Sequence, residues 1–240
     1  MIIDFHCHLY DFGKTLSEEI AKAKLQGINK WISTALTPDE FQWHLKKGFL
    51  FVAGIHPYYL ENSEFNFDSY LQNIYNCSDE SFWGIGEIGL DTRNKNLEHQ
   101  KTIFIKQVKI AMELDKPIII HSVKSYYEIF KILKTFNPKI PIIFHCFNGS
   151  NEIVDLYKNF NAYFSINNQI LRKKNAGKIL EKLYLSKKLL FETDANYQRK
   201  DLFNLRNTLN QVAVKLEIQV DDILSYYDEM CKKLYEKKSR

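Results

Sequence analysis

The chain lacks the features that mark secreted, membrane-spanning or disordered proteins. Its 240 residues contain four cysteines with no Cys-x-x-Cys spacing, so neither a disulfide framework nor a structural zinc site is predicted. No window reaches the roughly 20 apolar residues of a membrane helix, and no charged segment precedes the apolar start as in a signal peptide. Linkers and low-complexity tracts are also missing. We therefore expect a cytoplasmic protein without membrane association, folded as a single domain over residues 1–240.

Charge gives little information about partners. The chain has 33 basic and 29 acidic residues, and its net charge of +4 is compatible with a polyanionic substrate without requiring one. Hydrophobic residues make up 45% and charged residues 26%, which is typical of a globular protein. No feature indicates an obligate protein partner.

Short apolar runs alternate with helix-length segments along the chain. The runs that we predict as strands are residues 2–8, 30–33, 49–53, 82–91, 117–121, 141–145, 162–166 and 189–192. Helices are predicted from Thr15 to Gly27, Thr37 to Gly48, Phe67 to Tyr75, Asn96 to Leu114 and Ser125 to Phe136, with one or two more after Asp201. Thr15 and Thr37 each precede a Glu at the capping-box spacing. This alternation favours the α/β class and predicts a (β/α)8 TIM barrel of parallel strands.

The first strand ends in two histidines, His6 and His8. Residues two apart in a strand project to the same side, so both imidazoles can reach one metal ion. An isolated His-x-His pair is more often ordinary hydrogen bonding. Metal binding becomes the favoured interpretation here because later strands also end near His, Glu or Asp.

Strand ends from distant parts of the sequence meet at one rim of such a barrel, where active sites are built. The six candidate metal ligands there are His6, His8, Glu87, His121, His145 and Asp194. Four imidazoles and two carboxylates suit Zn²⁺ or Mn²⁺ and are too rich in nitrogen for Ca²⁺. Six ligands exceed the three or so that one catalytic zinc uses, so we predict two divalent ions (zinc, manganese or magnesium) bridged by Glu87.

A further histidine and several aromatic residues follow other strands. His56, within Gly54-Ile55-His56-Pro57, is a candidate for contacting a substrate phosphate; the alternative is a loop histidine that stabilises the turn. The aromatic residues at the expected rim either stack on bases or simply pack. They are Tyr58, Tyr59, Phe147 and Tyr197.

Six motifs follow one another over residues 2 to about 197. They are His6-Cys7-His8, Gly54-Ile55-His56-Pro57, Gly86-Glu87-Ile88-Gly89-Leu90-Asp91, His121-Ser122, His145-Cys146-Phe147-Asn148-Gly149 and Glu192-Thr193-Asp194-Ala195. In this order they resemble the motifs of the TatD family of metal-dependent deoxyribonucleases. The resemblance implies a hydrolase of the amidohydrolase type that acts on DNA from 3′ ends, with single-stranded nucleic acid as substrate. It also implies two metal sites that share Glu87. One is formed by His6, His8, Glu87 and Asp194, the other by Glu87, His121 and His145.

The chain departs from the family pattern beside the ligands. Val123 stands where an arginine is common, and Lys124 is the candidate to replace it in substrate binding. Lysine offers phosphate a point charge, whereas arginine offers a planar fork. Asn196 and Asn148 stand where the family commonly has proline and Ser or Thr, respectively. These changes leave the ligands intact and alter the pocket wall.

Three functional hypotheses follow. The leading one is two-metal hydrolysis of phosphodiester bonds, with Glu87 and Asp194 as catalytic residues and Asp194 accepting the proton of the attacking water. The second is hydrolysis of an ester, amide or lactone, including removal of an amino acid by a D-aminoacyl-tRNA deacylase, because an activated water also attacks carbonyl carbon. The third, a non-catalytic binding protein on the same barrel, is disfavoured by the complete ligand set.

Overall fold

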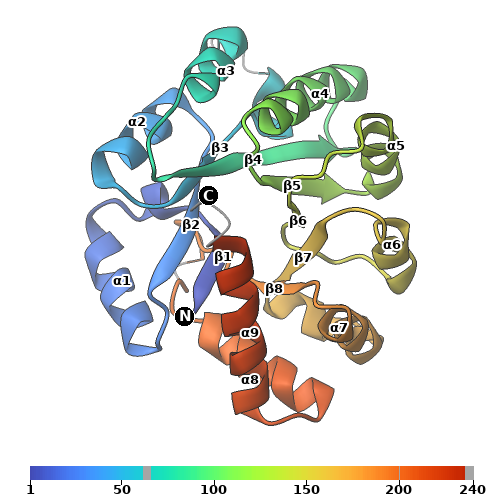
Figure 1. Ribbon diagram of the computed structural model, residues 1–240. Helices are drawn as coiled ribbons and strands as arrows, with labels where there is room; N and C mark the ends of the chain where they lie inside the picture. Colours follow the sequence, from blue (N-terminus) through green and yellow to red (C-terminus); the bar gives the residue numbers. More distant parts are fainter. Residues whose placement is uncertain (62–65, 200, 236–240) are drawn as a thin grey trace. The chain divides into compact units, whose positions relative to one another are not determined.

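The computed structural model describes residues 1–61, 66–199 and 201–235, in which strands and helices alternate as expected (Figure 1). The strands are β1 (Ile3–Cys7), β2 (Lys30–Ala35), β3 (Phe51–Ala53), β4 (Phe82–Asp91), β5 (Ile118–Val123), β6 (Ile142–Phe144), β7 (Ala162–Ile166) and β8 (Leu189–Phe191). The α-helices are α1 (Leu16–Leu25), α2 (Pro38–Lys47), α3 (Phe67–Tyr75), α4 (Leu97–Glu113), α5 (Tyr126–Phe136), α6 (Asn151–Leu156), α7 (Ala176–Leu185), α8 (Leu205–Leu216) and α9 (Val220–Tyr235). Short 3₁₀ helices are η1 (Leu9–Thr15), η2 (Pro57–Glu61) and η3 (Asn168–Arg172).

The eight strands form one sheet in the order β1-β2-β3-β4-β5-β6-β7-β8. The strand pairs β2–β3, β3–β4, β4–β5, β5–β6 and β7–β8 are all parallel. Sequential parallel strands, each followed by a helical connection, are the arrangement of the predicted (β/α)8 barrel, and the predicted fold class is confirmed. None of the described helices is long and apolar enough to cross a membrane.

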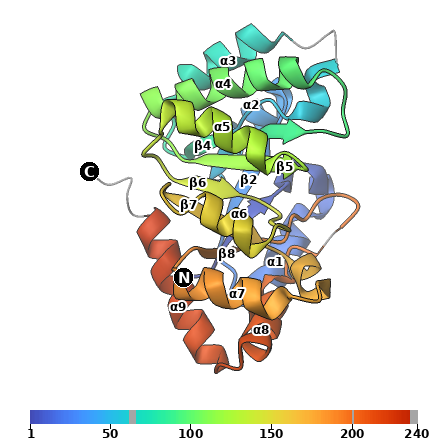
Figure 2. The same ribbon diagram turned by 90° about the vertical axis from the view of Figure 1, so that its right-hand side faces the viewer.

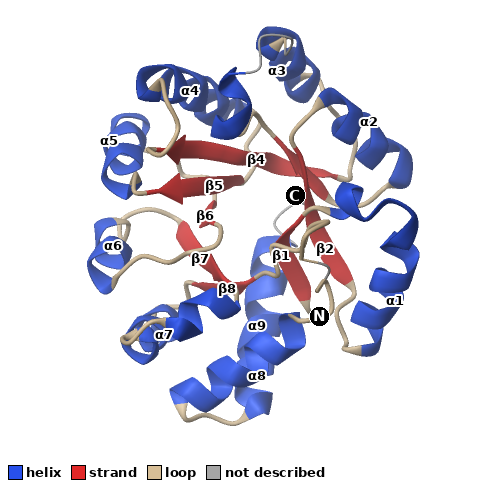
Figure 3. Ribbon diagram, turned by 180° about the vertical axis from the view of Figure 1, so that it is seen from behind, coloured by secondary structure: helices blue, strands red, loops and turns tan. Residues whose placement is uncertain are grey.

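The chain divides into two compact units. The first consists of Met1–Ile32, Cys146–Val154 and Tyr163–Arg240, and the second of Ser33–His145 and Asp155–Ala162. In the first unit α7 and α8 pack on β8, and α9 packs on α8 (Figure 2). In the second unit β4 and β5 lie side by side, and α4 and α5 pack on them (Figure 3). Because the strands are covered by helices, their side chains form continuous apolar runs instead of alternating with polar residues.

The two capping-box predictions have opposite outcomes. At α2, the Thr37 hydroxyl accepts a hydrogen bond from the Glu40 N–H, and the Glu40 carboxylate accepts one from the Leu36 N–H. Gly48 then ends α2 in the left-handed conformation, as expected. At α1 the prediction is wrong. Thr15 already has helical backbone angles because η1 runs directly into α1, and its hydroxyl donates to the Phe12 carbonyl instead.

Strand boundaries differ from the predicted ones beside the candidate ligands. β5 continues past His121 to Val123, whereas β4 spans Phe82–Asp91 as predicted, with Glu87 inside the strand. β6 ends at Phe144, so His145 lies one residue beyond the strand. The predicted strand ends at His121 and His145 are therefore wrong by two residues and by one residue, respectively.

Gly89 is the glycine of β4 at which an added side chain would make the shortest contact. It pairs in register with His121, its φ is +150°, and a Cβ built on it would lie 1.9 Å from the His121 carbonyl oxygen. Any L-residue here would separate β4 from β5 beside the candidate ligand.

We expect Gly89→Ala to lower the free energy of unfolding by about 2–4 kcal/mol, because it adds both backbone strain and a steric clash. Gly177→Ala is the matched control, since Gly177 lies in α7 with only ordinary contact distances around the added methyl. That control should stabilise by about 0.5–1 kcal/mol, as alanine does relative to glycine in a helix. Urea unfolding checks both, and equal stability of Gly89→Ala and the wild type would contradict the assignment.

Candidate metal centre

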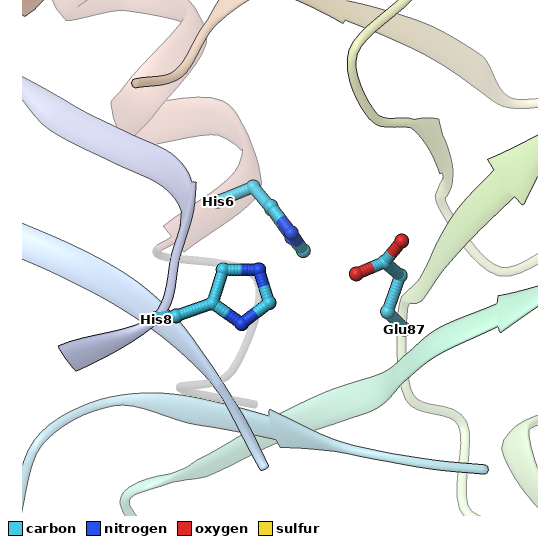
Figure 4. Close-up of side chains that lie close together, drawn as sticks. All are labelled: His6, His8 and Glu87. Atoms are coloured by element: carbon cyan, nitrogen blue, oxygen red, sulfur yellow. The ribbon is translucent and has the colours of Figure 1, made fainter. Parts of the chain in front are cut away.

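In the first unit, β1 carries the two histidines of the His-x-His motif. Their imidazoles point to the same side of the chain, with ring centroids 5.1 Å apart (Figure 4). Asp194 lies against them, with its Oδ1 3.6 Å from His8 Nε2 and 3.8 Å from His6 Nε2. Three residues separated by almost the whole chain are thus neighbours, as the sequence predicts.

Asp194 is placed by backbone hydrogen bonds between the segment after β8 and the end of β1. Its N–H donates to the His6 carbonyl at 3.0 Å, and the His8 N–H donates to the Ala195 carbonyl at 2.9 Å. The Asp194 backbone is left-handed, with φ of 54°, a conformation that aspartate visits more readily than most residues. This turn directs the carboxylate toward the histidines.

A fully buried carboxylate, Asp4, anchors the same turn. Asp4 accepts hydrogen bonds from the Thr193 N–H at 2.9 Å, the Thr193 hydroxyl at 2.5 Å and the His6 N–H at 3.2 Å. Burial raises the pKa of Asp4 to about 8, and the bonds from Thr193 and His6 oppose that rise. Asp4 was not predicted, although it lies two residues before His6 and so on the same side of the strand.

In the second unit, three histidine nitrogens converge on one carboxylate oxygen. Glu87 Oε1 lies 2.7 Å from His145 Nε2, 2.8 Å from His121 Nδ1 and 3.3 Å from His56 Nε2. The nitrogens of His121 and His145 are themselves only 3.2 Å apart. Glu87 is 4% exposed, so its charge requires compensation from these neighbours or from a cation.

An irregularity in β4 presents Glu87. The β4–β5 register shifts between Ile85 and Ile88, where Gly86 and Glu87 form a bulge. Bulges redirect side chains and are common next to active sites. A Cβ at Gly86 would lie 2.9 Å from Ile119 Cβ, so glycine permits the close approach of β5. The carboxylate that this bulge presents is also drawn in Figure 4.

Two buried glutamines of α4 hold the adjoining backbone. Gln107 accepts from the Ile55 N–H at 2.6 Å and donates to the Ile55 carbonyl at 3.2 Å, which fixes the loop that carries His56. Gln100 makes the same pair of bonds to Asp91, at 2.9 and 3.1 Å. The sequence analysis missed both. The sequence feature that could have revealed them is the spacing of Gln100 and Gln107, which places two amides about two helical turns apart on the apolar side of α4.

Asp91 and Arg93 orient His121, and neither was predicted to do so. The Arg93 guanidinium donates to both Asp91 oxygens, and Asp91 Oδ2 lies 3.3 Å from His121 Nε2. Burial alone would raise the pKa of Asp91, but hydrogen bonds from Arg93 and His121 outweigh it and lower the pKa to about 2. The charged Asp91 thus accepts the Nε2 proton of His121, which leaves Nδ1 as the nitrogen that can bind a metal.

His56 has a different tautomer. Its Nδ1 accepts a hydrogen bond from the Tyr58 N–H at 3.0 Å, so the neutral ring carries its proton on Nε2, toward Glu87. Burial lowers the pKa of His56, and the nearby Glu87 opposes that change. His56 is therefore placed to donate a hydrogen bond to an oxygen, whereas His121 offers a lone pair.

The other predicted contact residues have mixed placements. Lys124 is exposed directly after β5 and has a positive φ of 52°. Tyr58 and Tyr197 are 71% and 60% exposed, as a stacking surface requires. Phe147 is only 1% exposed and packs on Phe164 with ring centroids 4.6 Å apart. The option that Phe147 stacks on bases is wrong, because the core already covers its ring.

Both groups of side chains fit a divalent cation. Separations of 3.6 and 3.8 Å, from His8 and His6 to Asp194, are too long for hydrogen bonds. Ligand atoms that each lie about 2.0–2.2 Å from one zinc ion are separated by roughly that range. In the second unit, Glu87 Oε1 lies 2.8 Å from His121 Nδ1 and 2.7 Å from His145 Nε2, and these two nitrogens are 3.2 Å apart. Imidazole with carboxylate is the donor set of Zn²⁺, Mn²⁺ and related ions.

Two buried carboxylates, Asp4 in β1 and Glu192 directly after β8, support the turn that carries Asp194. Glu192, next to Thr193, accepts a hydrogen bond from the Cys146 N–H at 2.5 Å. Together with Asp4 it holds the segment after β8 from both sides. We therefore expect this segment to respond to small changes at Asp4.

Asp4→Ala should lower the free energy of unfolding by about 2–4 kcal/mol, because it leaves the buried N–H groups of Thr193 and His6 without an acceptor. Asp4→Asn should cost less than about 1 kcal/mol at pH 6, where a carboxyl with a pKa of about 8 is neutral and the amide matches its shape. Urea unfolding at that pH measures both. Equal destabilisation by the two substitutions would contradict a neutral Asp4.

A parallel (β/α)8 fold with two groups of imidazole and carboxylate side chains on and next to its strands is typical of metal-dependent hydrolases. The family model of the TatD related DNases matches residues 3–236. The chain therefore belongs to this family, and the resemblance found in its motifs is confirmed.

Several proteins are similar to most or nearly all of the chain. An uncharacterized metal-dependent hydrolase of Methanocaldococcus jannaschii is 27% identical over 96% of this chain and 95% of its own length. The 3′-5′ ssDNA/RNA exonuclease TatD of Escherichia coli is 27% identical over 78% of this chain and 75% of its own length. The crystal structure of the TatD homologue YjjV of E. coli has the same fold, with a TM-score of 0.82 and 22% identity over 97% of each chain.

Proposed function

We propose that the protein is a two-metal exonuclease that removes nucleotides from the 3′ end of single-stranded DNA, with the whole chain acting as one catalytic domain. The observation that carries the proposal is the convergence of His56, His121 and His145 on Glu87 Oε1. A buried carboxylate with imidazole nitrogens this close is a preformed cation site. The exonuclease names of the E. coli relative and of its counterparts support the substrate class.

The proposed ligands divide into two sets that share Glu87. His6, His8 and Asp194 would hold one ion together with Glu87, and His121 and His145 would hold the other. Glu87 suits the bridging position because each of its two oxygens can bind one ion. Two bound divalent ions would supply an acidified water and would stabilise negative charge on the attacking and leaving oxygens.

The remaining steps fall to residues of the chain. Asp194 accepts the proton of the attacking water through a carboxylate oxygen, and His56 donates its Nε2–H to a phosphate oxygen. Lys124 adds positive charge for the phosphate. The water oxygen forms the new bond to phosphorus as the P–O3′ bond breaks. The leaving O3′ takes up a proton from solvent, so the shortened strand keeps a 3′-hydroxyl, and the terminal nucleotide leaves as a 5′-monophosphate.

A carbonyl substrate, as in a D-aminoacyl-tRNA deacylase, is the second candidate. The observation in its favour is Val123, the last residue of β5, at the position where an arginine fork for phosphate is common in the family. The exposed Lys124 provides only a point charge in its place. The same acidified water would then attack carbonyl carbon.

The first test of the proposal counts metal. Purified protein should contain about two equivalents of divalent ion per chain, as a two-metal site requires. His121→Ala combined with His145→Ala should lose at least one of them. His99→Ala removes an imidazole from an exposed position of α4 and should leave the content unchanged. Elemental analysis after dialysis decides, and metal-free wild-type protein that gains no activity with Mn²⁺, Zn²⁺ or Mg²⁺ would refute the proposal.

The second test separates the two substrate classes. Single-stranded DNA labelled at either end is incubated beside D-aminoacyl-tRNA and simple esters at a fixed Mn²⁺ concentration. We expect 5′-mononucleotides from the 3′ end, with activity reduced about 10²–10⁴-fold in Asp194→Asn because the proton acceptor is weakened. Cleavage of the esters alone, also lost in Asp194→Asn, would assign the carbonyl reaction instead.

A further inference from the structure

A polar cavity of about 230 Å³ lies in the first unit beside Asp194. It is formed by η3, by the segment after β8 and by the start of α8. The lining residues used below are Asn168, Gln169, Arg172, Glu192, Thr193, Arg199 and Asp201. None of them is a proposed metal ligand.

The charges of this cavity nearly balance. Two guanidinium groups, of Arg172 and Arg199, and two carboxyl groups, of Glu192 and Asp201, are among its described lining residues. Burial raises the pKa of Asp201, and its Oδ1 is buried without a hydrogen-bond partner in the described part of the chain. A cavity built from amides, guanidinium groups and carboxyls suits a neutral molecule with many donors and acceptors better than a simple anion.

Two contacts join the cavity to the proposed reaction centre. The Arg199 guanidinium lines the cavity and donates to Asp194 Oδ2 at 2.7 Å. Thr193, which also lines the cavity, directly precedes Asp194 and is held by Asp4. A ligand in the cavity therefore lies next to the carboxylate to which the mechanism assigns the proton.

We infer that this cavity binds the base and sugar of the 3′-terminal nucleotide, with Arg199 at its edge contacting the scissile phosphate. This inference rests on the proposed function. The cavity volume of about 230 Å³ has room for a ligand of the size of a single nucleoside. Asn168 and Gln169 are the amides that can pair with the edges of a base.

The assignment of Arg199 also accounts for Val123. A guanidinium offers phosphate two parallel hydrogen bonds, and Arg199 supplies this group from the segment after β8 instead of from the end of β5. Without substrate, Asp194 occupies one edge of the guanidinium. With substrate, the same edge is available to a phosphate oxygen.

The direct test is binding to metal-free, full-length protein. Deoxynucleosides and deoxynucleoside 5′-monophosphates are titrated calorimetrically against the wild type, against Asn168→Ala combined with Gln169→Ala, and against Asn175→Ala. Asn175 is an exposed asparagine outside the cavity and serves as the amide control. We expect the double variant to raise Kd at least tenfold and the control to stay within twofold. Equal deoxynucleoside affinity of the double variant and the wild type overturns the inference.

A kinetic arm separates this inference from the proposed function. With Mn²⁺ bound, the wild type and the double variant should hydrolyse bis(p-nitrophenyl) phosphate equally, while KM for a single-stranded oligonucleotide rises at least tenfold in the double variant. An unchanged KM overturns the terminal-nucleoside site but does not affect the proposed nuclease function. A wild type that hydrolyses neither phosphodiester refutes the proposed function, and the titration with metal-free protein then decides the cavity alone. Equal urea midpoints for all variants exclude unfolding as a cause.

Discussion

The feature on which the rest depends is a buried carboxylate surrounded by imidazoles. Glu87 sits in a bulge of β4, and His56, His121 and His145 direct ring nitrogens at one of its oxygens. A carboxylate in such a position is costly unless positive charge compensates it, and neutral imidazoles compensate only through hydrogen bonds. A cation bound among the same atoms compensates the negative charge more completely. The arrangement is therefore explained better as a metal-binding site than as side-chain packing alone.

The candidate ligands are held by groups that do no chemistry themselves. Gln107 fixes the loop that carries His56, and Arg93 keeps Asp91 charged so that Asp91 accepts the Nε2 proton of His121. In the other unit, three hydrogen bonds to Asp4 hold the turn that presents the Asp194 carboxylate. Supporting contacts of this kind fix which nitrogen or oxygen faces a metal, and thus set its affinity and reactivity.

The sequence predicted the fold class and the neighbours His6, His8 and Asp194 because both follow from local periodicity and from the rule that strand ends meet at one rim. It missed the two buried glutamines of α4, since their partners are backbone groups that no side-chain pattern reveals. The capping box at Thr15 failed for a related reason, as the residues before it already form η1. The link from Arg199 to Asp194 depends on a loop conformation, which the sequence does not specify.

The central claim is that the two groups of ligands bind two ions and share Glu87. Anomalous diffraction from crystals grown with Mn²⁺ or Zn²⁺ tests this claim most directly. The account predicts two anomalous peaks, one coordinated by His6, His8 and Asp194, the other by His121 and His145, with a Glu87 oxygen bound to each. A single ion, or two ions of which one has no bond to Glu87, would contradict it.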